Sequence, residues 1–251
     1  MKIPVPELEL APEGDLPSHS HMALDEVLLE AVAAGRRPPL LRFWGWTQPT
    51  LVLGSNQSVA NEVDEDAAAL RGFSITRRLS GGGTMLAEPG RTITWSLAIP
   101  LGAVSGLSFV ESFAHLDRWA VEVLRELGVE AGYRPINDII SPAGKIAGAA
   151  QARRRGGVLH HVTMAYSMDP AVLRELVRVG RPSVSEKGVR SADKVVSPLD
   201  TLTRASRAEV VAALGAASGA APGGVEPAEL EAAAALAEQR YSRRSWIHRL
   251  P

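Results

Sequence analysis

The chain of 251 residues is long enough for one large α/β domain or two small ones, each with a sizeable core. Its 27 basic and 28 acidic side chains give a formal net charge of −1, so no overall positive field favours nucleic acid or membrane as a partner. Cysteine is absent from the sequence, which excludes disulfides, thiolate metal sites and an acyl-thioester formed on this chain.

The first 17 residues are acidic and interrupted by proline, and they predict an irregular N-terminal arm over 1–17. This arm lacks the basic start and the apolar run of a signal peptide. No later stretch approaches the roughly 20 apolar residues that span a bilayer. We therefore expect a cytoplasmic protein that binds neither membrane nor nucleic acid.

Helical and strand-like hydrophobic patterns follow one another along the rest of the chain. The helical pattern predicts helices over 21–34, 64–70, 108–127, 207–217 and 227–241. Alternation and β-branched residues predict strands over 40–46, 50–54, 73–78, 92–99, 138–140 and 158–167. Because no linker clearly divides these elements, residues 18–251 are predicted to form a single domain of the α/β or α+β class.

The strongest local signal is a glycine-rich segment that follows a predicted strand, Arg77-Arg-Leu-Ser-Gly-Gly-Gly83. Three successive glycines permit a tight turn whose N–H groups point at an anion, and the two arginines add charge that reaches a phosphate or carboxylate. A flexible hairpin loop explains the same glycines. The segment is not a Walker A loop, because no Gly-Lys-Ser/Thr follows, and it does not match GxGxxG.

A rare lysine stands among small residues in the segment Gly144-Lys-Ile-Ala-Gly148. The sequence has four lysines against 23 arginines. A lysine presents a compact point charge, and small neighbours allow a ligand to approach the ammonium and the backbone together. A solvated lysine at a turn is the alternative interpretation.

Two further pairs of polar residues are candidates for the same site. Asn137 and Asp138 stand at the start of a predicted strand, where they either bind Mg²⁺ beside a phosphate or form a turn. His160 and His161 lie in a predicted strand, and strand alternation points their rings to opposite faces of the sheet. One of the two rings is therefore expected to face a pocket while the other packs inside the protein.

Together these segments resemble the family of lipoate–protein ligase A and the octanoyltransferases, which is related in fold to the biotin–protein ligases. The resemblance extends from about Met22 to Trp246. The order and spacing of these segments carry it: Met22-Ala-Leu-Asp-Glu26, Leu41-Arg-Phe-Trp-Gly-Trp46, Leu53-Gly-Ser-Asn-Gln57, Arg77 to Gly83, Asn137-Asp138, Gly144 to Gly148, His160-His161 and Lys187-Gly-Val-Arg-Ser191.

The resemblance implies a mixed β-sheet flanked by helices around a bowl-shaped pocket. It makes Lys145 the catalytic residue, in contact with the acyl carbonyl and the phosphate region, while Asp138 is the expected Mg²⁺ ligand. The residues expected to bind the substrate or its adenylate are Arg77, Arg78, Ser80, Gly81, Gly82, Gly83, Asn137, Gly148 and His160. The C-terminal accessory domain found in many such ligases is not expected here.

The sequence therefore predicts a lipoate–protein ligase. In this reaction lipoate and ATP give lipoyl-adenylate, and the lipoyl group then passes to a lysine of an acceptor domain. The expected acceptors are the lipoyl domains of 2-oxoacid dehydrogenase complexes or the glycine cleavage H protein, and a separate accessory ligase chain is a further candidate partner. Two alternatives stay open: an octanoyl or lipoyl transferase of the same family, and a non-catalytic protein that binds lipoate.

Overall fold

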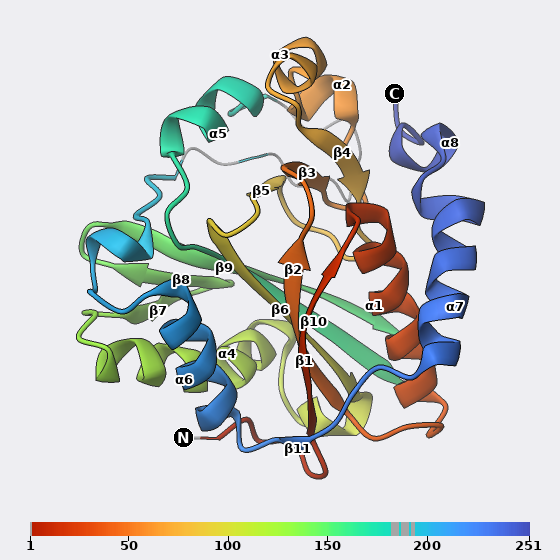
Figure 1. Ribbon diagram of the computed structural model, residues 1–251, viewed down its shortest axis with the longest axis vertical. Coiled ribbons are helices and arrows are strands. Elements are labelled where there is room, and N and C mark those ends of the chain that lie inside the picture. Colours follow the sequence, from red (N-terminus) through yellow and green to blue (C-terminus); the bar gives the residue numbers. More distant parts are fainter. Residues whose placement is uncertain (1, 182–185, 187–190, 192–193) are drawn as a thin grey trace.

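The computed structural model describes residues 2–181, 186, 191 and 194–251, and these form two β-sheets with helices around them (Figure 1). The larger sheet has the strand order β11-β1-β2-β6-β10-β9-β8-β7, and the smaller sheet has the order β4-β3-β5. Parallel pairs join β1 to β2 and β11, while antiparallel pairs join β2, β6, β10, β9, β8 and β7. The predicted mixed sheet flanked by helices is confirmed.

The strands of the larger sheet are β1 (Glu9–Leu16), β2 (Leu40–Trp46), β6 (Thr92–Pro100), β7 (Gly132–Arg134), β8 (Asp138–Ser141), β9 (Gly144–Arg154), β10 (Gly157–Ala165) and β11 (Ala221–Pro222). Those of the smaller sheet are β3 (Thr50–Leu53), β4 (Ser74–Arg77) and β5 (Met85–Ala87). The helices are α1 (Ser18–Ala33), α2 (Val59–Glu62), α3 (Glu65–Leu70), α4 (Phe109–Glu126), α5 (Pro170–Leu176), α6 (Arg207–Ser218), α7 (Pro227–Leu236) and α8 (Arg244–Ile247).

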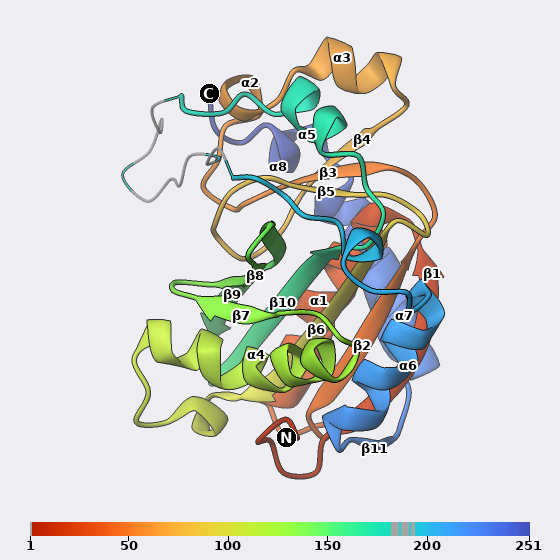
Figure 2. The ribbon, with the colours of Figure 1, turned by 90° about the vertical axis from the view of Figure 1, so that its left-hand side faces the viewer.

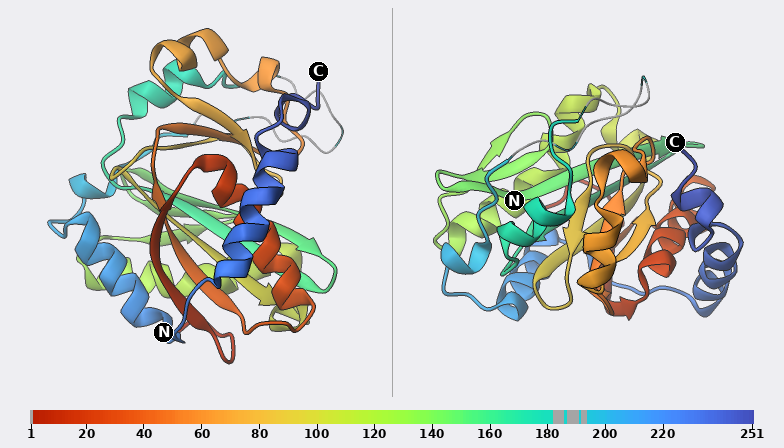
Figure 3. Two further views of the ribbon diagram at one scale, coloured as in Figure 1. Left: turned by 45° about the vertical axis from the view of Figure 1, so that its right-hand side comes forward. Right: turned by 90° about the horizontal axis from the view of Figure 1, so that it is seen from above.

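Alternation along the strands gives the larger sheet two different faces. On β6, the odd-numbered side chains from Ile93 to Ile99 belong to the core that α4 and α6 complete. The even-numbered positions from Thr94 to Ala98 face the side on which α1 and α7 pack. Figures 2 and 3 show these two layers of helices on opposite faces of the sheet. On β6 and β10, an odd or even residue number therefore decides which layer of helices the side chain meets.

The smaller sheet lies beyond one end of the larger one and has its own apolar core with α2, α5 and α8. Its strand β3 pairs in parallel with β4 and antiparallel with β5. The glycine-rich segment leaves the end of β4 and returns through β5, so it lies where the two sheets meet. None of the described helices has both the length and the apolar composition of a membrane span.

The prediction of an irregular arm over 1–17 is wrong for its second half. Glu9–Leu16 forms β1, which pairs in parallel with β2 from Glu9↔Leu40 onward. The strand contains Pro12 and Gly14 and shifts register between Ala11 and Gly14. Such an interrupted pattern gives no strand signal by itself, because pairing with a buried neighbour supplies the stabilisation.

Two other elements differ from the predictions. The segment predicted as one helix over 227–241 is an α-helix to Leu236 followed by a π-helical turn, Ala237–Tyr241. The residues around Lys145 belong to an eleven-residue strand, β9. Its glycines and alanines lack the β-branched side chains that signal a strand, and its hydrogen bonds to β8 and β10 hold it in place.

Candidate active site

A pocket of about 490 Å³ lies between the two sheets. Its walls come from the smaller sheet, from β6, β9 and β10 of the larger sheet, and from the start of α4. The apolar side chains that line it include Met22, Trp44, Val52, Phe109, Phe113, Met168 and Leu173. The polar ones include Arg78, Asn137, Lys145, Gln151, His161 and Lys194. Such a mixture suits a ligand with an apolar chain and one charged or polar end.

The glycine-rich loop, Gly81 to Gly83, forms one wall of this pocket. Its carbonyl groups turn toward Arg78, which donates from Nη2 to Gly81 O at 2.6 Å and to Gly83 O at 2.8 Å. Gly82 has a φ of 89°, a conformation that favours glycine. The N–H groups of these three glycines donate to no acceptor in the described part of the chain. The loop thus offers unpaired backbone donors at the pocket wall.

The structure assigns the two predicted anion-binding arginines different positions. Arg78 lines the pocket, but its side chain is buried and holds the loop from behind. Arg77 does not line it: its guanidinium donates to Gly54 O at 2.9 Å, to Gln57 O and to Ile247 O at 2.5 Å. Burial lowers the pKa of each arginine to about 10. The structure does not place Arg77 where it was predicted to contact the adenylate. Arg77 has a structural role instead, because its guanidinium connects the end of β4 to the C-terminal segment.

Lys145 reaches the pocket from β9 and forms an ion pair with Asp138, with 2.8 Å between Nζ and Oδ1. Burial is the main cause that lowers the pKa of Lys145, and the nearby carboxylate of Asp138 partly offsets it. The position of Lys145 explains why residue 148 is glycine, since a Cβ built on Gly148 would lie 2.8 Å from Lys145 Cε. The lysine stem therefore lies directly on the backbone of Gly148.

Asp138 does not provide the predicted magnesium site. Its carboxylate is buried, and its second oxygen pairs with the ammonium of Lys194. The charge of the two lysines lowers the pKa of Asp138 despite its burial. A divalent cation does not fit beside two ammonium groups. The described residues also hold no cluster of three or more histidine or carboxylate side chains that suits a metal.

Asn137, which precedes Asp138, lines the pocket. Its side-chain amide donates to Ala149 O at 2.5 Å, and its own carbonyl accepts from Ala149 N at 2.9 Å. These two bonds attach the start of β8 to β9. They hold Asn137 beside the strand that carries Lys145.

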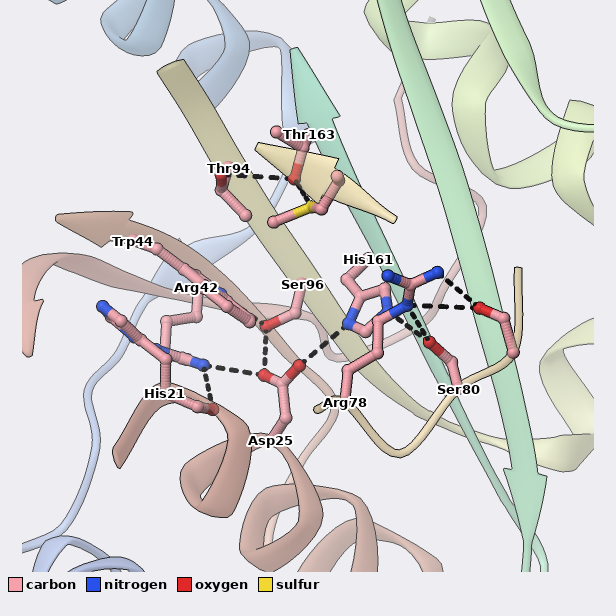
Figure 4. A network of polar contacts seen from close by, with 12 residues as sticks. His21, Asp25, Arg42, Trp44, Arg78, Ser80, Thr94, Ser96, His161 and Thr163 are labelled. Carbon is pink, nitrogen blue, oxygen red and sulfur yellow. Dashed lines mark hydrogen bonds and ion pairs between the residues drawn. The ribbon is translucent and has the colours of Figure 1, made fainter. Parts of the chain in front are cut away.

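The paired histidines lie on opposite faces of β10, and the structure reverses the role predicted for His160. The ring of His160 is fully buried under α4, where Nε2 lies 2.7 Å from Asp117 Oδ1. His161 instead lines the pocket. Its Nε2 lies 2.6 Å from Ser80 Oγ, and its Nδ1 lies 3.1 Å from Asp25 Oδ2 (Figure 4). Ser80 itself is buried beneath the loop and touches His161 rather than lining the pocket.

Several residues of this site were not among the predicted site residues, although Asp25 and Arg42 lie in segments that carry the family resemblance. Asp25 on α1 and Arg42 on β2 form a buried ion pair, with 2.7 Å between Nη2 and Oδ1. Lys194 is distant in the sequence and reaches the site because the following residues pair with β9, at Lys145↔Val196, which brings its ammonium to Asp138. Of the motif 187–191, only Ser191 lies within the described residues, and it donates to Glu62 Oε2 from both N and Oγ.

Acid is expected to destabilise the fold through its buried histidines. Burial lowers the pKa of His21 to about 3 from 6.5, and burial also lowers the pKa of His161. The unfolded chain therefore binds protons below pH 6.5 that the folded chain does not bind, so stability falls as the pH falls. Between pH 6.5 and the pKa of about 3, His21 contributes about 1.4 kcal/mol per pH unit to this loss.

Urea unfolding between pH 7 and pH 5 measures this dependence. The variant His21→Gln, which cannot titrate, should show a shallower loss of the free energy of unfolding than the unsubstituted chain. An equal slope in the two proteins would contradict the assignment of the acid sensitivity to His21.

The comparisons with known proteins agree with this fold. The model of the lipoyl protein ligase A/B catalytic domain matches residues 17–218. The octanoyltransferase LipM of Kyrpidia tusciae is 30% identical over 240 residues, which cover 84% of this chain and 86% of that protein. The octanoyltransferase LipM of Symbiobacterium thermophilum is 30% identical over 188 residues, which cover 66% of this chain and 68% of that protein.

Solved structures share the whole architecture. A bi-partite lipoate protein ligase from Thermoplasma acidophilum, described with its E2 lipoyl domain, has a TM-score of 0.81 at 24% identity and covers 96% of this chain and 95% of its own. A lipoate-protein ligase A bound with ATP has the same TM-score and identity and covers 96% and 98%. The chain belongs to the family of lipoyl protein ligase A/B catalytic domains and is an enzyme of the lipoate ligase and transferase type.

Proposed function

We propose that this enzyme transfers an octanoyl or lipoyl group to the side-chain amine of a lysine on a lipoyl-acceptor domain. The observation that carries the proposal is the juxtaposition of the Lys145 ammonium with the unpaired N–H groups of Gly81 to Gly83 at the walls of one largely apolar pocket. The apolar walls suit the acyl chain. The cation and the N–H groups suit an acyl carbonyl oxygen as it gains negative charge.

The chemistry is a direct attack by the acceptor amine. The amine nitrogen forms a bond to the carbonyl carbon, and the carbonyl oxygen takes up negative charge beside Lys145. The bond from that carbon to the leaving group then breaks with its electron pair, and the amine loses one proton to water. No covalent intermediate on this chain is needed, in keeping with a sequence that has no cysteine.

The first candidate donor is an octanoyl thioester on a carrier, and octanoyl transfer is the activity named for the relatives. The thiol of the carrier is then the leaving group. Because this chain has no cysteine, transfer goes straight from the carrier thioester to the acceptor lysine.

The second candidate donor is lipoyl-adenylate formed from lipoate and ATP, with AMP as the leaving group. It is favoured by three cationic side chains among the described residues that line the pocket, Arg78, Lys145 and Lys194. Asp138 neutralises only part of this charge, so a phosphate has favourable partners. The structurally similar lipoate-protein ligase A was solved with bound ATP, which also supports the adenylate as donor.

A donor screen tests the proposal and separates the two candidates. The purified chain is incubated with a lipoyl domain and with one of three donors: octanoyl-carrier thioester, lipoate with ATP and Mg²⁺, or chemically prepared lipoyl-adenylate. The intact mass of the acceptor is then measured. Octanoylation from the thioester supports the first candidate, and lipoylation from lipoate and ATP supports the second. An acceptor that gains no acyl group from any donor would refute the proposed transfer and leave a lipoate-binding role.

A further inference from the structure

A continuous chain of buried hydrogen bonds joins α1 to the glycine loop. Asp25 Oδ2 lies 3.1 Å from His161 Nδ1, and His161 Nε2 lies 2.6 Å from Ser80 Oγ. Ser80 Oγ in turn lies 3.1 Å from Arg78 Nε. The last member, Arg78, holds the carbonyl groups of Gly81 and Gly83. Figure 4 shows these four residues with the hydrogen bonds that join Asp25 to His161, His161 to Ser80 and Ser80 to Arg78.

The direction of every bond in this chain is fixed by its two ends. An ionised carboxylate only accepts hydrogen bonds, so His161 Nδ1 carries a proton and donates to Asp25. Arginine only donates, so Ser80 Oγ accepts from Arg78 Nε. Among the described residues His161 Nε2 is the only acceptor that Ser80 Oγ contacts, so the Ser80 hydroxyl satisfies its own hydrogen by donating to His161. The Nε2 atom of His161 must then be the unprotonated acceptor. Only the neutral ring with its proton on Nδ1 satisfies all four residues at once.

Asp25 is itself held in place by further buried donors. Its Oδ1 atom accepts from Arg42 Nη2 at 2.7 Å and from Ser96 Oγ at 2.8 Å. Arg42 also contacts His21, which stacks on Trp44 with 4.7 Å between the ring centroids. These donors, together with His161, hold the buried carboxylate in one orientation. His161 is therefore oriented by a rigid group on one side and contacts Ser80, at the foot of the loop, on the other.

The position of Arg78 decides which way the loop presents its backbone. Its Nη1 atom donates to Val52 O at 3.0 Å while Nη2 donates to the loop, so the guanidinium lies between the smaller sheet and the loop. While it holds the loop carbonyls there, the loop N–H groups are left without a protein acceptor in the described residues. Ser80 is the side chain that links Arg78 Nε to His161.

From this geometry we propose that His161 is a positioning residue, whose neutral ring keeps Ser80 and Arg78 in the arrangement that presents the N–H groups of Gly81 to Gly83 to the acyl oxygen. The inference rests on the proposed acyl transfer. It gives His161 no contact with the reacting atoms; its effect passes through Ser80 and Arg78 to the loop backbone.

Protonation of His161 should break this arrangement. A proton on Nε2 turns that atom into a donor, so Ser80 Oγ must accept from both His161 and Arg78 and its own hydrogen loses its partner. The charged groups that face the ring are Asp25 from α1, which favours the charged form, and Arg78, which opposes it, with His160 opposing it weakly. Burial is the largest influence and lowers the pKa of His161 below 6.5, so the ring is neutral at pH 7.

The variants His161→Gln and His161→Ala test the inference, with His160→Gln as a matched control. Glutamine keeps an oxygen acceptor near the position of Nε2 but cannot be protonated, whereas alanine removes the acceptor. His160 is an adjacent, fully buried histidine that also bonds an aspartate, on the opposite face of β10. Each protein is studied by ¹⁵N–¹H correlation spectra of the amides of residues 81–83 from pH 7.5 down to the lowest pH at which the chain stays folded, and by the pH profile of acyl transfer over the same range.

In the unsubstituted chain and in His160→Gln, the three glycine amides should titrate together and transfer should fall on the acid side with the same midpoint. In His161→Gln the amide titration and the acid limb should disappear, and transfer at pH 7.5 should fall less than in His161→Ala. His161→Ala should lower kcat more than it raises KM, by up to about 10²-fold, as a misplacement of roughly 1 Å in an oriented group costs.

Amide shifts that titrate equally in His161→Gln and the unsubstituted chain would overturn the inference, and so would an unchanged acid limb. The spectra need no enzymatic turnover, so they judge the role of His161 even if the donor screen finds no transfer. Transfer without any titration of the loop amides would refute the positioning role and leave the proposed function standing.

Discussion

Replacing Lys145 by alanine is expected to slow acyl transfer by about 10²-fold or more, the usual cost of losing a donor to a developing oxyanion. The effect should appear with either acyl donor, because both pass through the same tetrahedral carbonyl. Folding should be little affected, since Asp138 keeps its second ammonium partner, Lys194. Single-turnover transfer measures the rate, and thermal unfolding serves as the check on folding.

Arginine at position 145 should not restore the rate. The lysine stem rests on the backbone of Gly148, and the larger planar guanidinium cannot take the same path and still present one compact charge to the carbonyl. Lys2→Ala provides a matched loss of one lysine outside the pocket lining. Near-normal transfer by Lys145→Ala, at a rate similar to that of Lys2→Ala, would remove Lys145 from the mechanism.

The second large effect is expected from Gly54→Ala, at the end of β3. A Cβ built on Gly54 would overlap the carbonyl oxygen of Gly82 and lie 3.0 Å from its carbonyl carbon. The glycine loop must then shift away, at a cost of about 1–3 kcal/mol in the free energy of unfolding, which is typical of overpacking. Because the shift moves the loop N–H groups, transfer should fall together with stability.

Gly81→Ala is the matched control for stability within the same loop. A Cβ at Gly81 meets no atom within 4 Å, and its φ is not in the left-handed region. Its melting temperature should therefore equal that of the unsubstituted chain. If Gly54→Ala melts at that same temperature and transfers at the normal rate, close approach of the loop to Gly54 does not matter for the site.

Local patterns predict the elements whose stability comes from their own residues. The helix with its capping box at Ser108 and Glu111 and the alternating strand β6 are both predicted within two residues of their observed bounds. Strands β1 and β9 escape prediction because neighbouring strands, rather than their own side chains, hold them extended. Their hydrogen bonds come from residues distant in the sequence.

The same distinction applies to the site. Alternation predicts that His160 and His161 face opposite sides of the sheet, but the side that holds the pocket depends on where α4 packs, so the choice of His160 was wrong. The sequence likewise does not show which of the adjacent side chains Arg77 and Arg78, at the end of β4, lines the pocket. The partnership of Asp138 with Lys194 could not be predicted either, because it spans 56 residues and replaces the expected metal.

The central claim is that an acceptor lysine attacks an acyl group held beside Lys145, with no covalent intermediate on this chain. The most direct measurement is the intact mass of both proteins, quenched at short times after the donor that is active in the screen is mixed with the enzyme, with and without the acceptor domain. We predict that the acceptor gains one acyl group on a lysine while the enzyme mass stays unchanged, even when the acceptor is left out. An enzyme that gains an acyl group before the acceptor does, for example as an ester on Ser80, would contradict the account.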